Sequence, residues 1–256
     1  MSDCKFFKFE QADGVAKITL NRPKHNVLNI EMMNELSNQF QVLANDVDLK
    51  CLVIFGEGKS WCAGVEVGDH RPEMVDEMMA AFSRTLELLD SFTVPTIAAV
   101  HGACLGGGME VAIACDMVIA SDSAVFGQPE IKLGFFPPYA AIRLPELVGP
   151  AKAIEVCVTG KRYSAGEALA MGMIATVVDK EQFSEKVEAM IKEISYCSPL
   201  IIRLNKQAVK DHLGCSFADG MKGVNDLFLN TLMKTEDTLE GIKSFEEKRR
   251  PLWKNK

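Results

Sequence analysis

The sequence lacks the residue patterns that mark a metal centre or a nucleophilic hydrolase. Its four histidines are widely separated and form no H-E-x-x-H motif, and its cysteines form no C-x-x-C pair. It has no G-x-S-x-G turn for a nucleophilic serine and no G-x-G-x-x-G loop for a dinucleotide. We therefore expect neither a metal site nor a dinucleotide site.

Basic residues are scarce relative to acidic ones. The 256 residues include 28 Lys and Arg against 35 Asp and Glu, which gives a formal net charge of −7. Nucleic acids and anionic membranes bind to basic surfaces, so we expect neither as a partner. An anionic ligand would have to be bound by a few local cations.

Signals for secretion and for membrane insertion are also missing. The first residues, MSDCKFFKFE, contain no apolar segment of the kind that a signal peptide needs, so we expect a cytoplasmic protein. The longest apolar stretch, residues 96–120, contains two acids and a histidine, which argues against a membrane span. The eight cysteines are scattered, and we interpret them as reduced core residues. Cys62 could be a nucleophile, although a small apolar filler is the simpler interpretation.

The apolar residues that are present follow strand and helix patterns in alternation. Residues 14–20 alternate like a half-buried strand, residues 29–45 are apolar at helical spacing, and residues 51–58 are a short apolar run that ends in glycine. The alternation recurs through residues 72–121. It predicts an α/β fold with largely parallel strand pairing.

The C-terminal part of the sequence has a different pattern. After about residue 179 the strand signal fades, and three amphipathic helical patterns follow one another. We therefore divide the chain into an α/β unit, residues 1–190, and a helical region, residues 191–256.

Three consecutive glycines, residues 106–108, interrupt the apolar stretch and are followed by Glu110. The order is strand, glycines, helix. Glycines at the start of a helix let a ligand approach the backbone closely, and the first N–H groups of a helix have no intrahelical partner. These donors can bind an anion. Tight packing of the helix is an alternative reason for the glycines.

A second glycine turn, residues 58–65, follows another apolar strand. Its first residues resemble the end of a phosphate loop, but Val53 stands where that motif requires glycine. What remains is a turn that can present the main-chain N–H of Val65. Two such turns facing each other would supply the paired donors that stabilise an oxyanion. That the turns do face each other is a hypothesis.

Two acids lie in apolar surroundings, where burial raises a carboxyl pKa towards the range useful for proton transfer. They are Glu110, on the helix after the glycines, and Glu130, in the segment 126–134. Two such carboxylates suit the roles of general acid and general base. A capped or ion-paired structural glutamate is the alternative for each one taken singly.

Six stretches, in this order, resemble the crotonase, or enoyl-CoA hydratase/isomerase, superfamily. They are LNRPKHNVLN (20–29), FGEGKSWCAGVEV (55–67), VPTIAAVHGACLGGGMEVAIACDMVIAS (94–121), FGQPEIKLG (126–134), TGKRYSAGEALAMGMI (159–174) and FEEKRRPLW (245–253). The resemblance implies a spiral of repeated ββα units over residues 1–190 and a helical oligomerisation region over residues 191–256. It further implies a homotrimer or a homohexamer built from two trimers.

The resemblance also implies an acyl-CoA thioester as the substrate, with no cofactor other than the coenzyme A that the substrate carries. The thioester oxygen is expected to be held by the N–H groups of Val65 and Gly107, with Ala63 and Gly106 beside them. A side chain at Gly107 would block the thioester, and the helix behind it adds a favourable dipole.

The acids distinguish the reactions of the superfamily. Hydratases that resemble this chain use two glutamates, which match Glu110 and Glu130, whereas many isomerases keep only the later one. The implied reaction is addition of water across a 2-enoyl-CoA double bond. Glu110 would orient and deprotonate the water, and Glu130 would deliver a proton to the α-carbon.

Three further sets of residues are expected to contact the substrate. Lys24, and Lys248 or Arg249, match family positions near the coenzyme A phosphates, although they could equally be ordinary surface cations. Met74, Met78 and Met79, in the segment 70–82, offer an adaptable apolar wall, although such a stripe is more often plain core. Bulky or rigid residues stand where open backbone is usual in the family, namely Phe135, Phe136, Pro138 and Tyr139.

This bulky segment resembles the branch of the superfamily that hydrates cyclohexa-1,5-diene-1-carbonyl-CoA during anaerobic aromatic degradation. Flat walls around a six-membered ring make physical sense. The alternatives are an open-chain 2-enoyl-CoA hydratase of fatty-acid β-oxidation, an enoyl-CoA isomerase and a non-catalytic member that binds RNA. The acidic charge and the two glutamates argue against the last.

Overall fold

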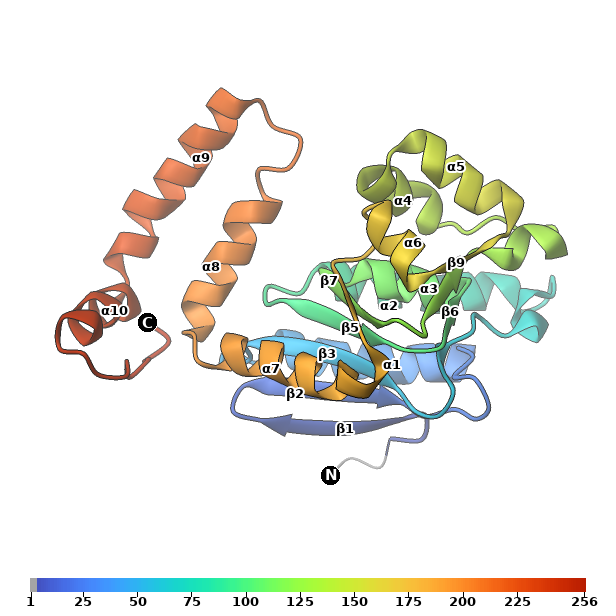
Figure 1. Cartoon of the computed structure of the whole chain (residues 1–256), viewed down its shortest axis with the longest axis horizontal. Coiled ribbons are helices and arrows are strands. Elements are labelled where there is room, and N and C mark those ends of the chain that lie inside the picture. The colour runs from blue at the N-terminus through green and yellow to red at the C-terminus, as the bar shows by residue number, and fades with distance from the viewer. Residues whose placement is uncertain (1–3) are drawn as a thin grey trace.

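Pairs of strands followed by helical segments build the body of the protein, which lies to the right in Figure 1. The computed structural model describes residues 4–256. The first two repeats are β1 (Phe7–Ala12), β2 (Val15–Leu20) and α1 (Ile30–Ala44), then β3 (Cys51–Gly56), β4 (Ser60–Cys62), η1 (Val67–His70) and α2 (Val75–Asp90). The next two are β5 (Thr96–Val100), β6 (Ala103–Leu105) and α3 (Gly107–Ala114), then β7 (Met117–Ser121), β8 (Val125–Gly127), η2 (Pro129–Leu133) and α4 (Ala140–Val148). The expected ββα spiral is confirmed.

The remaining elements of the body include the last strand of each of its two sheets. They are α5 (Pro150–Thr159), β9 (Arg162–Ser164), α6 (Ala165–Ala170), β10 (Thr176–Val178), η3 (Lys180–Gln182) and α7 (Phe183–Ser195). The strands form a large sheet of order β1-β2-β3-β5-β7-β10 and a small sheet of order β4-β6-β8-β9. Among the described strands, only β1 with β2 and β8 with β9 pair antiparallel. The prediction of largely parallel pairing is therefore confirmed.

The pairing in the small sheet determines where the turns after β4, β6 and β8 lie. Because β4 pairs in parallel with β6, and β6 with β8, the carboxyl ends of these three strands lie side by side. The register places Cys62 beside Cys104 and Leu105 beside Gly127. The turns that follow these strands therefore leave the sheet at one edge.

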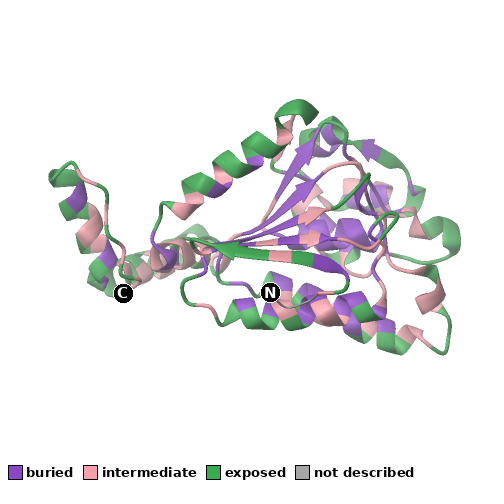
Figure 2. Ribbon diagram, turned by 90° about the horizontal axis from the view of Figure 1, so that it is seen from below, coloured by how far each residue is buried: buried purple, intermediate pink, exposed green. Residues whose placement is uncertain are grey.

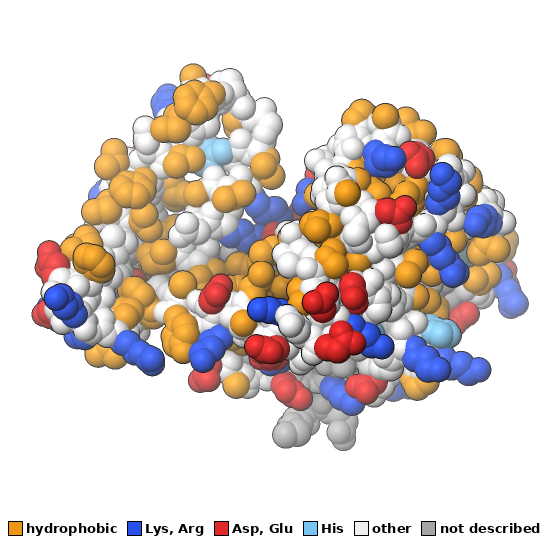
Figure 3. Space-filling model, viewed as in Figure 1, with side chains coloured by type: hydrophobic (Ala, Val, Ile, Leu, Met, Phe, Trp, Pro, Cys, Tyr) orange, Lys and Arg blue, Asp and Glu red, His pale blue; other side chains and the backbone are white. Residues whose placement is uncertain are grey.

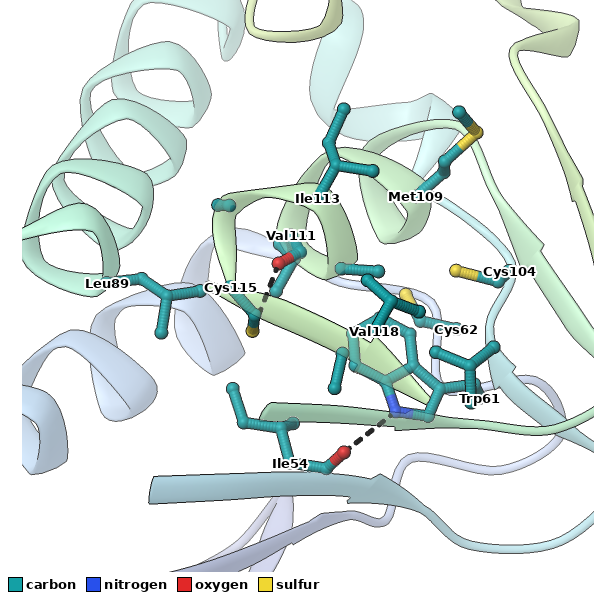
Figure 4. Packing of buried hydrophobic residues seen from close by; sticks show 14 of the residues in the cluster. Ile54, Trp61, Cys62, Leu89, Cys104, Met109, Val111, Ile113, Cys115 and Val118 are labelled. Carbon is teal, nitrogen blue, oxygen red and sulfur yellow. Dashed lines mark hydrogen bonds between the residues drawn. The ribbon is translucent and has the colours of Figure 1, made fainter. Parts of the chain in front are cut away.

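The large sheet separates two apolar cores because successive side chains of a strand point to opposite faces. On β3, Ile54 belongs to the main core under α1, α2 and α3, whereas Val53 belongs to a smaller core on the other face. Figure 2 shows the strands as mostly buried. In the main core, the indole N–H of Trp61 donates to the carbonyl oxygen of Ile54 at 3.0 Å (Figure 4).

α7 covers the smaller core, into which it inserts Val187 and Ile191. This helix spans residue 190, the expected domain boundary, and belongs to the layered body over its whole length. The arm begins after α7, and the division of the chain at residue 190 stays a prediction. An amphipathic pattern predicts that a helix packs, but not against which element.

The helical region forms an arm, to the left in Figure 1. It consists of α8 (Pro199–Lys210), α9 (Phe217–Asn230), η4 (Leu232–Lys234) and α10 (Glu236–Glu246). Lys206 of α8 ties the arm to the body, because its Nζ atom donates to Asp116 at 2.5 Å and to the carbonyl oxygen of Val94 at 2.9 Å. Within residues 4–256, no helix has both the length and the apolar composition to cross a membrane.

Candidate active site

The turns after β4 and β6 lie against each other at the edge of the small sheet. A Cβ atom added to Gly107 would lie 2.5 Å from Cγ2 of Val65, and one added to Gly106 would lie 3.6 Å from Cα of Gly64. Gly106 also has a φ of 54°, in the left-handed region that favours glycine. The two glycine turns that the sequence singles out are thus brought together, and Gly107 leaves no room for a side chain.

Two main-chain N–H groups in these turns have no acceptor among the residues that the structure describes. Leu28 holds the first turn on either side of Val65, since its N–H donates to Gly64 at 2.8 Å and its carbonyl oxygen accepts from Glu66 at 2.7 Å. Neither the N–H of Val65 nor that of Gly107 donates to any acceptor within residues 4–256. Gly107 is the first residue of α3, so the helix dipole adds positive potential there.

Both turns line a cavity of about 560 Å³. Glu110 and Glu130 line the same cavity, and most of its remaining wall is apolar. The apolar wall consists of Ala63, Val67, Val75, Met78, Met79, Phe82, Pro129, Leu133, Phe135, Phe136, Pro137 and Pro138, and His70 and Lys132 complete the lining. A large apolar cavity with a few convergent polar groups is the usual form of a small-molecule site.

Glu110 is 2% exposed and lies in the first turn of α3. Its Oε1 atom accepts two main-chain N–H groups at the start of α4, from Tyr139 at 2.7 Å and from Ala140 at 2.9 Å. Within the described chain, Oε2 has no protein donor. Burial, aided by the charge of Glu130 and opposed by the two N–H donors, raises the pKa of Glu110 to about 7.

Glu130 comes from η2, directly after β8. Its Oε1 atom lies 2.6 Å from the position that a Cβ atom on Gly106 would occupy, so the carboxylate reaches the glycine turn. Burial also raises the pKa of Glu130 to about 7. The amide nitrogen of Gln128, in the orientation that satisfies its hydrogen bonds, donates to Oε1 of Glu130 at 2.9 Å. Near neutral pH the two carboxyl groups can therefore exist as one acid and one base.

The raised pKa of Glu110 predicts a pH-dependent stability. Below its ordinary value of 4.5 the carboxyl group is neutral in both the folded and the unfolded chain, and as the pH rises towards 7 the unfolded chain releases the proton first. The wild-type protein should therefore lose stability over this range through Glu110, a contribution that Glu110→Gln lacks, while Glu130 contributes in both proteins. We expect the advantage of Glu110→Gln in free energy of unfolding to grow by about 3 kcal/mol between pH 4.5 and pH 8.

Urea unfolding of the wild type and of Glu110→Gln at several pH values measures this difference. Glu57→Gln is the matched control, because it removes one carboxylate from an exposed position. A constant difference between Glu110→Gln and the wild type across the pH range would contradict the burial of an ionisable group at Glu110.

The structure brings most of the predicted site residues to this cavity. Those that line it are Ala63, Val65, Gly106, Gly107, Glu110, Glu130, Phe135, Phe136 and Pro138. Four others lie elsewhere: Met74 packs partly buried against the main core, Tyr139 lines a neighbouring cavity, and Lys24 and Lys248 are exposed outside the lining. The contacts of these four with a substrate stay predictions.

The structure adds residues that the sequence interpretation missed. Phe82 lines the cavity from α2, and its place in the apolar stripe of that helix was the only signal in the sequence. His70 also lines the cavity, with its ring centroid 4.9 Å from that of Phe135. Gln128 is fully buried beside Glu130, and its position in the sequence gives no sign of this burial.

The alternative chemistries find little support in the part of the chain that the structure describes. Within residues 4–256, no three His, Cys, Asp or Glu side chains are grouped closely enough to hold a metal ion. Cys62 is fully buried, and burial raises the pKa of its thiol to about 12. A thiol in this state is a poor nucleophile, so the structure favours the apolar-filler interpretation.

The fold and the site define a ββα spiral in which two glycine turns and two acids share one apolar cavity. The sequence pattern described as "Enoyl-CoA hydratase/isomerase" matches residues 10–256. The chain belongs to this family, which confirms the crotonase resemblance.

Individual relatives are similar to this chain over almost its whole length. A probable enoyl-CoA hydratase of Mycobacterium tuberculosis is 38% identical over 245 residues, which cover 94% of this chain and 95% of the relative. A probable mitochondrial enoyl-CoA hydratase of Arabidopsis thaliana is 33% identical over 246 residues, covering 94% and 81%. The crystal structure of an enoyl-CoA hydratase from Bacillus anthracis has 30% identity and a TM-score of 0.92, covering 98% of this chain and all of that one.

Proposed function

We propose that the protein is an enoyl-CoA hydratase that adds water across the 2,3-double bond of an acyl-CoA thioester. One observation carries this proposal. Glu110 and Glu130 line the same cavity as two main-chain N–H groups that have no acceptor within the described residues, those of Val65 and Gly107. An isomerase moves a proton and needs only one acid, whereas hydration needs a base for water and an acid for carbon.

The proposed reaction uses each group once. The carbonyl oxygen of the thioester accepts from the N–H groups of Val65 and Gly107, which stabilise the negative charge that develops on it. Glu110, ionised, accepts a proton from a water molecule while the water oxygen bonds to C3. Glu130, protonated, gives its proton to C2. The raised pKa values of the two acids suit this division near neutral pH.

Glu110 is the better candidate for the base because its geometry is fixed. The N–H groups of Tyr139 and Ala140 hold Oε1, which leaves Oε2 for water. After the reaction Glu110 carries the proton and Glu130 does not, so exchange with solvent restores the starting state.

For the acyl group we propose a cyclic dienoyl thioester, cyclohexa-1,5-diene-1-carbonyl-CoA. Phe135, Phe136 and Pro138 support this choice, because they give the cavity flat or rigid walls that suit a six-membered ring. The product would be a 6-hydroxycyclohex-1-ene-1-carbonyl-CoA, formed by 1,4-addition: the water oxygen bonds to the β-carbon, Glu130 gives its proton to the far end of the conjugated diene instead of C2, and the remaining double bond shifts next to the thioester-bearing carbon. Open-chain 2-enoyl-CoA is the alternative, since the remaining wall, with Met78 and Met79, is adaptable.

One experiment tests the reaction and the acyl group together. Purified protein is incubated separately with the two substrates; loss of the enoyl-thioester absorbance is followed for crotonyl-CoA, and loss of the dienoyl absorbance together with formation of the hydroxylated product for the cyclic dienoyl-CoA. We expect hydration of both, with the higher kcat/KM for the cyclic substrate. Preference for crotonyl-CoA would reject the cyclic proposal, migration of the double bond without hydration would indicate an isomerase, and binding without reaction would indicate a non-catalytic role.

We further propose that the arm forms a homotrimer, or a hexamer of two trimers. The support is the apolar surface of α9, where Phe217, Phe228 and Leu229 are exposed; orange side chains are frequent over this arm in Figure 3. Lys24 and Lys248 stay proposed contacts of the coenzyme A phosphates, and their exposure leaves them accessible to a ligand. A cytoplasmic location also stays a prediction.

A further inference from the structure

A second cavity, of about 400 Å³, lies between α2 and α4. It adjoins the cavity that Glu110 and Glu130 line, which is called the catalytic cavity below. The apolar lining of the second cavity includes Leu86 and Ile142, and its polar lining includes Ser83 and Tyr139. Charged side chains complete the lining; Asp90 is paired with Lys210 at 2.9 Å, and Arg143 is paired with Glu146 at 2.5 Å. The proposed hydration uses no side chain that belongs to this second cavity alone.

The two cavities share a wall of three residues, Met79, Phe82 and Pro138. Met79 and Phe82 are three positions apart on α2, so they lie on one face of the helix. Pro138 faces them from the segment that leads into α4 and has little freedom to move because its φ is fixed. Of the three, Phe82 is the largest and is 3% exposed.

Phe82 also lies next to the proposed thioester site. Its Cζ and Cε2 atoms are 3.3 and 3.4 Å from the position that a Cβ atom on Gly107 would occupy. The ring therefore reaches the glycine whose N–H is proposed to hold the thioester oxygen. An acyl chain that starts there meets this ring before it can reach the second cavity.

We propose that Phe82 determines acyl-chain specificity by closing the acyl pocket against the second cavity. This inference rests on the proposed function in one respect, that the catalytic cavity holds the acyl part of a CoA thioester. With Phe82 in place, compact acyl groups, a short chain or a single ring, are preferred. Without it, a long alkyl chain passes between α2 and α4 and lies against Leu86 and Ile142.

The experiment compares Phe82→Ala and Phe82→Leu with the wild type, using crotonyl-CoA and 2-decenoyl-CoA as substrates. We expect Phe82→Ala to raise the ratio of kcat/KM for decenoyl-CoA over crotonyl-CoA at least ~10-fold, the discrimination that an apolar pocket achieves between acyl groups. Phe82→Leu should shift the ratio in the same direction by less, and it keeps the core filled if the alanine variant is unstable.

Two further variants separate this effect from a general loss of packing. Phe92→Leu is the matched control, since Phe92 is also 3% exposed in the main core but meets Phe40 edge to face and lines neither cavity. It should leave the ratio unchanged. Adding Ser83→Phe to Phe82→Ala places a new ring in the second cavity and should cancel most of the gain with decenoyl-CoA.

Binding of butyryl-CoA and decanoyl-CoA, measured by calorimetry, tests the inference without turnover. Their Kd ratio should shift as the kcat/KM ratio does. A wild type that already processes decenoyl-CoA as well as crotonyl-CoA, or folded Phe82 variants with unchanged ratios, would overturn the role of Phe82. A shifted Kd ratio in a protein that hydrates neither substrate would support that role and reject the proposed hydration.

Discussion

Glu110→Gln and Glu130→Gln are each expected to lower kcat for hydration by roughly 10²–10⁴-fold, the range typical of general acid and base catalysis. Glutamine has nearly the shape of glutamate but can neither accept the proton of water nor donate one to carbon under these conditions. Hydration of crotonyl-CoA, or of the better substrate, measures the loss. Binding of butyryl-CoA should change little, because neither acid is needed to hold the thioester.

The folded structure should survive both substitutions. The side-chain oxygen of glutamine can still accept from Tyr139 and Ala140, so the start of α4 keeps its partner at position 110. Glu57→Gln, at an exposed position that pairs with Lys8, is the control for loss of one charge. Near-normal turnover in either active-site variant would show that the role given to that residue is wrong.

Gly107→Ala is expected to lower kcat by roughly 10²–10³-fold, the typical cost of losing one donor to a developing oxyanion. The new Cβ atom would lie 2.5 Å from Cγ2 of Val65, closer than real contacts allow, so Val65 must move. Val65 carries the other proposed donor. One methyl group therefore disturbs both donors, and steady-state hydration together with butyryl-CoA affinity measures the effect.

Gly166→Ala is the matched control for this substitution. Gly166 lies in the first turn of α6, and a Cβ atom there meets no other atom within 4 Å. We expect unchanged kcat and a gain in stability of up to ~1 kcal/mol from the better helix propensity of alanine. If Gly107→Ala also kept full activity, the thioester oxygen could not be held by the proposed pair of donors.

The alternation of strands and helices could be predicted from the sequence because each pattern is local, whereas the ββα order followed from the family resemblance. An alternating run and a helical stripe are both visible within one segment, as in residues 14–20 and 29–45. Gly107 and Glu110 could also be singled out from the sequence, since glycines weaken regular structure and a buried acid is costly, so an apolar stretch rarely contains both. The chemistry followed from the family resemblance, and the catalytic roles await the experiments above.

The meeting of the two glycine turns could not be predicted from local pattern. It depends on the pairing of β4 with β6, and each of these strands has only three residues, too few to show a period. The direction in which each side chain points could not be predicted from local pattern either. Met74 precedes α2 and does not line the cavity, whereas Met79 and Phe82 line it from the helix. Tyr139 donates its main-chain N–H to Glu110 but lines the neighbouring cavity.

The parallel small sheet has a consequence for how such a protein can change its chemistry. The second repeat supplies one amide, the third supplies an amide and Glu110, and the fourth supplies Glu130, each from a separate turn. Glu130 thus belongs to a different repeat from both proposed thioester donors, whereas Glu110 shares a repeat with Gly107. Substitution of Glu130 alone would therefore change the proposed proton transfer while the proposed thioester donors, Val65 and Gly107, stay unchanged.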